Sequence, residues 1–141
     1  MSELFELRLE VPFVPPDNSA IVSSRLKEAI SKAAVDSGVE KVVAEGKLEP
    51  TFGQRLPTKE EVDIVLAILA FTIEQAPKAW PHLKAFLEQL WARLQKATPI
   101  AIKADITIGK KKVHVEGLTP DDAIKVITKE YEVYFQPRSQ G

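Results

Sequence analysis

One uninterrupted apolar segment constrains this chain more than any other feature of its sequence. Every residue of Ile64–Phe71 is apolar. Thr58 and Glu61 form a Thr-x-x-Glu capping box just before it, which is typical of a helix N-terminus. We therefore predict a helix over residues 62–73 that has no solvent face and is buried either in the core or in a protein interface. This helix is too short to span a bilayer.

A second helix is predicted after a break at Gln75–Pro77, with Pro81 in its first turn. Apolar residues recur at helical spacing from Trp80 to Leu94. The short connection predicts an antiparallel pair of helices. The candidate partner interface on this pair consists of Leu66, Leu69, Trp80 and Trp91. The alternative is that both tryptophans pack in the core.

Strands are expected on both sides of the helix pair. Residues alternate between apolar and polar over 4–14 and again over 100–115, which predicts a first strand and a β-hairpin with its turn at Gly109–Lys110. Residues 39–44 form a β-branched segment that predicts a further short strand. The glycines and prolines of residues 45–57 predict a long loop.

Two further helices are marked by their ends. Apolar spacing between a cap at residues 17–19 and the stop at Gly38 predicts the first. Thr119 caps the last, with Pro120 in its first position, and residues 131–135 could add a short strand after it. We predict one α+β domain over residues 1–136, with βαβ-αα-ββα order, and a disordered tail over 137–141. The expected sheet has about four strands, with helices mainly on one face.

Composition limits the classes of partner. Nineteen Lys and Arg against twenty Asp and Glu give a net charge of -1, which disfavours a broad electrostatic grip on nucleic acid or on a membrane. The absence of cysteine excludes thiol catalysis and thiolate metal sites. The first ten residues alternate between acidic and apolar, unlike a signal peptide, so we expect a cytoplasmic protein.

No combination of residues predicts a reaction centre. His82 and His114 lack any ligand or catalytic motif. The paired acids at 60–61 and 121–122 stand in first helical turns, where the helix dipole explains them. Nucleophile-elbow and phosphate-loop motifs are absent from the sequence. We therefore expect a non-enzymatic protein without a metal or cofactor.

Two other surfaces keep alternative functions open. Gly53 and Arg55, in the predicted loop, could contact an anion and make the chain a small-molecule or nucleotide sensor. Lys110, Lys111 and Lys112, at the hairpin tip, could contact the phosphates of a nucleic acid, although a solvated turn is the favoured explanation at this near-neutral net charge.

The chain also resembles a known family in its middle and C-terminal parts. The resemblance lies in Gly53–Gln54, in the apolar segment 62–73, in Leu87–Leu94 with its Trp91 and Arg93, and in Val115–Asp122. In these segments the chain is similar to the effector-associated constant component proteins of bacterial conflict systems. That resemblance implies a small non-enzymatic adaptor that couples a sensor to an effector, and it carries over no catalytic residue. We therefore expect a protein–protein interaction module, with another protein or itself as its partner.

Overall fold

The computed structural model describes residues 2–55, 63–97 and 102–135. Within these residues the fold is α+β, as expected. In chain order, the elements are β1 (Ser2–Phe13), α1 (Ser19–Ser37), the 3₁₀ helix η1 (Val39–Val42), β2 (Val43–Gly46), β3 (Thr51–Arg55), β4 (Asp63–Glu74), α2 (Ala76–Ala97), β5 (Lys103–Ile108), β6 (Lys111–Val115) and α3 (Pro120–Phe135).

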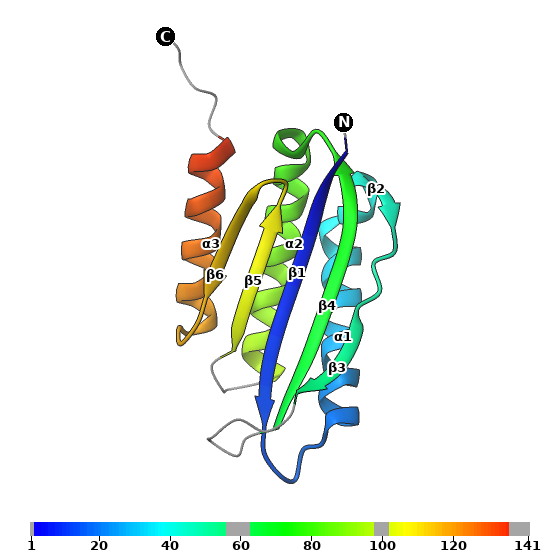
Figure 1. Cartoon of the computed structure of the whole chain (residues 1–141), viewed down its shortest axis with the longest axis vertical. Helices are drawn as coiled ribbons and strands as arrows, with labels where there is room; N and C mark the ends of the chain where they lie inside the picture. Colours follow the sequence, from blue (N-terminus) through cyan, green and yellow to red (C-terminus); the bar gives the residue numbers. More distant parts are fainter. Residues whose placement is uncertain (1, 56–62, 98–101, 136–141) are drawn as a thin grey trace.

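The strands form one antiparallel sheet with the long strand β1 at its centre. The strand order is β2-β4-β1-β5-β6, and β3 also pairs with β4. The six strands exceed the expected sheet of about four. Figure 1 shows α1, α2 and α3 on the same side of the sheet, so the opposite face carries no helix of the described chain.

The apolar segment is a strand, and the prediction of a helix over residues 62–73 was wrong. In β4, Val65, Ala67 and Leu69 are buried beneath the helices, whereas Leu66 and Ile68 alternate with them and point to the other face. Because β4 is apolar on both faces, the alternation typical of a half-buried strand is absent from its sequence. The capping box at residues 58–61 lies outside the described residues. The expected pair of middle helices is replaced by β4 and α2.

The predicted loop over residues 45–57 was correct only for residues 47–50, which form neither strand nor helix. It was wrong at residues 45–46 and 51–55, because β2 and β3 lie there and both pair with β4. The short strand expected over 39–44 begins as η1 and becomes extended only at Val43. Gly46 is required where β2 pairs, since its φ is +108° and an added Cβ would lie 3.0 Å from the Cβ of Phe71 on β4.

The capping residues lie at the ends of α1 and α3 as predicted, whereas α2 begins earlier than predicted. The Asn18 side chain accepts a hydrogen bond from the N–H of Ile21 at 2.9 Å, and Gly38 ends α1 in the left-handed conformation, as predicted. Thr119 accepts from the N–H of Asp122 at 3.2 Å before α3. The expected break at residues 75–77 was wrong in part, because α2 begins at Ala76. The short strand expected over residues 131–135 is the last part of α3.

The core lies between the sheet and the helices. Phe5 stacks on Phe71 with ring centroids 4.7 Å apart, and Phe86 of α2 contacts Phe5 edge-on. Tyr131 attaches α3 to the hairpin because its buried hydroxyl lies 2.6 Å from the Ile106 carbonyl oxygen. Burial raises the pKa of this hydroxyl, so it stays protonated and can donate. Among the described helices none is long and apolar enough to cross a membrane.

Candidate functional site

The candidate site is the helix-free face of the sheet, called the open face below. It consists of the outward residues of five strands, which the pairing registers place in rows (Figure 1). The outward side chains on it are Thr51 of β3; Ile64, Leu66, Ile68, Ala70 and Thr72 of β4; Leu4, Glu6, Arg8, Glu10 and Pro12 of β1; Lys103, Asp105 and Thr107 of β5; and Lys112 and His114 of β6, with Gly53 at the β3 edge.

The apolar part of the open face follows β4. Ile64, Leu66 and Ile68 are half-buried although no described helix covers them, and Ala70 beyond them is exposed. We call these four residues the β4 stripe. At about 3.4 Å per residue the stripe is about 20 Å long and one strand wide. Aliphatic side chains on the uncovered face of a sheet are typical of a surface that another protein covers.

The rest of the open face carries charges of both signs. The register pairs Arg8 of β1 with Asp105 of β5, and Glu10 with Lys103. Opposite charges that face each other across neighbouring strands stabilise a sheet modestly. Because the signs are mixed row by row, this half of the face presents no broad positive or negative field.

His114 lies between two carboxylates on this charged half. Its Nδ1 is 2.6 Å from Oδ1 of Asp105, and its Nε2 is 3.1 Å from Oε1 of Glu116. A carboxylate only accepts, so both contacts are hydrogen bonds only when the ring is protonated. The bond to Asp105 first and the bond to Glu116 second raise the pKa of His114. When the ring is protonated, each of its two nitrogens therefore donates to a carboxylate.

Only one of the four predicted interface residues lies on this face. Leu66 points outward, directly opposite Glu10. Leu69, Trp80 and Trp91 are buried, with 1%, 8% and 1% of their surfaces exposed. The helix prediction placed Leu66 and Leu69 on one side, whereas an odd separation in a strand places them on opposite faces.

The predicted ligand loop is an edge strand. Gly53 pairs with Leu66, and Arg55 pairs with Ile64, so both backbones belong to β3. A hollow of about 430 Å³ lies elsewhere, between η1, β2 and the start of α2, where Lys41, Glu74 and Lys78 line it. The ordered strand at Gly53 and Arg55 therefore does not form a lid over this hollow.

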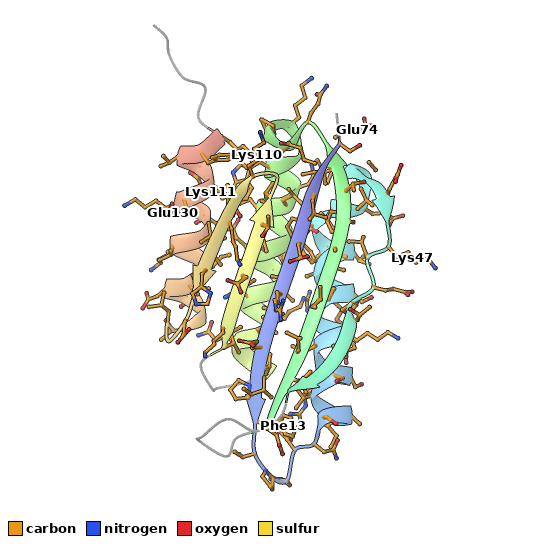
Figure 2. All side chains as sticks on the ribbon, viewed as in Figure 1. Phe13, Lys47, Glu74, Lys110, Lys111 and Glu130 are labelled. Atoms are coloured by element: carbon orange, nitrogen blue, oxygen red, sulfur yellow. The ribbon has the colours of Figure 1, made fainter. Side chains whose placement is uncertain are left out.

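The lysine-bearing turn is only partly free. Lys111 forms an ion pair with Glu130 of α3 at 3.3 Å, and Figure 2 shows both residues beside the same strand end. Lys110 and Lys112 are exposed. The outward residues of the open face include no aromatic ring on which a base could stack. The turn therefore presents two exposed lysines, Lys110 and Lys112, rather than an extended basic surface.

The described ranges, residues 2–55, 63–97 and 102–135, contain no candidate metal site. No group of three or more His, Cys, Asp or Glu side chains in them is arranged to hold a metal ion. His82 is half-buried on α2, and its Nδ1 has no hydrogen-bond partner there. The outward residues of β1 and β5 were not singled out by sequence reasoning, although their alternation with the core residues of each strand was the signal that could have shown them.

Comparison with known proteins adds little. No protein-family model matches the chain, and no curated protein matches it. Among solved structures, the chain is similar to the solution NMR structure of a de novo designed protein with a ferredoxin fold. The two sequences are 13% identical, the match covers 84% of this chain and 86% of that chain, and the TM-score is 0.38. A likeness at this level carries no argument about function.

Proposed function

We propose that this chain is a non-enzymatic protein–protein interaction module and that the open face is its binding surface. The observation that carries the proposal is the β4 stripe, whose Ile64, Leu66 and Ile68 are half-buried although no described helix covers them. Core burial alone does not require aliphatic residues on this side of β4, because the inward residues of that strand already contact the helices. The stripe therefore has the character of an interface core.

The chemistry of the face also limits the partner. A flat face with an apolar centre and charges of both signs fits a protein surface of similar character and little net charge. The resemblance to the effector-associated constant component family supports the same class of function, an adaptor between a sensor and an effector. The open face offers neither the aromatic rings nor the positive field that would favour nucleic acid.

A matched pair of outward substitutions tests the proposal. Ile68→Lys places a charge within the β4 stripe, and Thr107→Lys places the same charge on the open face away from it. Both positions point away from the core, so both variants should fold, which circular dichroism and thermal unfolding would verify. We expect proteins captured by the tagged native chain to be lost with Ile68→Lys and kept with Thr107→Lys. Equal capture by the two folded variants would refute the proposal.

A further inference from the structure

The charges of the open face alternate in sign along β1 and along β5. On β1 the outward residues Glu6, Arg8 and Glu10 run negative, positive, negative. On β5 the outward residues Lys103 and Asp105 run positive, negative, in the rows of Glu10 and Arg8. Such a surface is complementary to a second copy of itself when the two faces meet with their strands running in opposite directions, so that each row lies over the neighbouring row of opposite sign. The partner that this pattern fits is therefore another copy of the same chain.

The geometry of that partner follows from the pairing registers. The register places Leu66 in the row of Glu10, and Ile68 in the row of Arg8. Consider a second copy stacked face to face, related by a twofold axis that runs across the strands midway between these two rows. The axis exchanges the rows, so Leu66 lies over Ile68 of the second copy. The same operation places Glu10 over Arg8 of the second copy.

The same twofold axis also brings opposite charges together on β5. Lys103 lies over Asp105 of the second copy, and Asp105 over Lys103. On β4, Ile64 lies over Ala70 of the second copy, so apolar residues meet apolar residues along the whole stripe. Each contact occurs twice, as an isologous interface requires. Two sheets about 10 Å apart bring side chains of this length into contact.

From this complementarity, and resting on the proposed function, we infer that the open face binds a second copy of the same chain. The area of the face is consistent with a stable dimer. Five strand positions spaced about 4.8 Å apart, over about 25 Å of strand, give roughly 600 Å² of flat surface before side-chain relief is counted. Standard interfaces bury about 800 Å² on each partner. The alternating charges also determine how the two copies align along the strands. An axis through the row of Arg8 would place this guanidinium over Arg8 of the second copy, where the two positive charges repel.

The decisive experiment uses two chains with opposite charge changes. Arg8→Glu makes every outward charge of β1 negative, so a carboxylate faces Glu10 of the second copy. Glu10→Arg creates the converse repulsion with Arg8. We expect the native chain to be a dimer by sedimentation velocity and light scattering, and each variant alone to dissociate with a Kd raised about a hundredfold. An equimolar mixture of the two variants should restore a dimer, because each introduced charge then faces its opposite.

Folding controls and the oligomeric state of the native chain determine how the result is interpreted. Circular dichroism of the separate variants verifies that they fold, and Ile68→Lys gives a second disruption that does not depend on the β1 charges. A native chain that stays monomeric up to several hundred micromolar overturns the inference but leaves the capture experiment to judge the proposed function separately. A native dimer that both single variants retain, or that their mixture fails to restore, overturns this interface. Restoration confirms that Glu10 and Arg8 face each other across copies.

Discussion

Leu66 and Leu69 provide a sharp test of how β4 is built, because they differ in face but not in residue type. Leu69 is 1% exposed beneath the helices, and Leu66 is half-buried on the open face. Leu69→Ala removes buried methyl groups and leaves a cavity, which costs about 3 kcal/mol. Leu66→Ala leaves a surface that water can reach, and costs about 0.5 kcal/mol in the monomer. Against a total stability of about 5–15 kcal/mol, the first loss is large.

The free energy of unfolding is measured by urea titration at low micromolar concentration, followed by tryptophan fluorescence. Trp80 and Trp91 are both buried, so their emission reports loss of the core. A difference of about 2.5 kcal/mol between the variants corresponds to a difference in Tm of roughly 10 °C for a domain of this size. Equal losses, as expected for two residues on one buried helix face, would refute the strand and its alternation.

Three further predictions concern the strand β2, the attachment of α3 to the hairpin, and the charged half of the face. Gly46→Ala should cost about 1–3 kcal/mol because of its φ of +108°, whereas Gly53→Ala, with nothing within 4 Å, should be neutral; equal urea midpoints would contradict this. Tyr131→Phe should cost about 1–2 kcal/mol, since a buried carbonyl loses its 2.6 Å partner; an unchanged midpoint would count against that bond. NMR titration should give His114 a pKa above its ordinary value of about 6.5, which Asp105→Asn lowers. Because the folded pKa is raised, the contribution of His114 to stability is complete below that ordinary value and is lost as pH rises through the folded pKa. The native and His114→Gln chains should therefore differ more in their free energy of unfolding at pH 5.5 than at pH 9. The same difference at both pH values would contradict the assignment.

The sequence carried clear signals wherever local chemistry decides the structure. The alternation of Phe5, Leu7 and Leu9 with charged residues defined β1, and Gly38 marked the end of α1. Gly109 marked the turn of the hairpin, with a φ of +63°. Each of these signals depends on the residue itself or on its near neighbours, so the chain folds there as its local pattern predicts.

The apolar segment was ambiguous because both faces of β4 are aliphatic. A short apolar segment without alternation can be a buried strand or a buried helix. The β-branched Ile64, Val65 and Ile68 are typical of a strand, whereas the prediction of a helix rested on the preceding capping box. The open face could not be located until β4 was placed beside β1, because tertiary pairing and not local pattern brings Ile68 next to Arg8.

The central position of β1 has a consequence for how the chain folds. Leu7 pairs with Leu69 on one side and with Ile106 on the other, so its neighbours lie about 60 and about 100 residues away along the chain. Synthesis proceeds from the N-terminus, and β1 therefore leaves the ribosome long before either neighbouring strand exists. Closing such long loops slows folding. Until β4 and β5 follow, β1 has an apolar face and two unpaired edges, and unpaired strand edges of this kind favour aggregation while the chain folds.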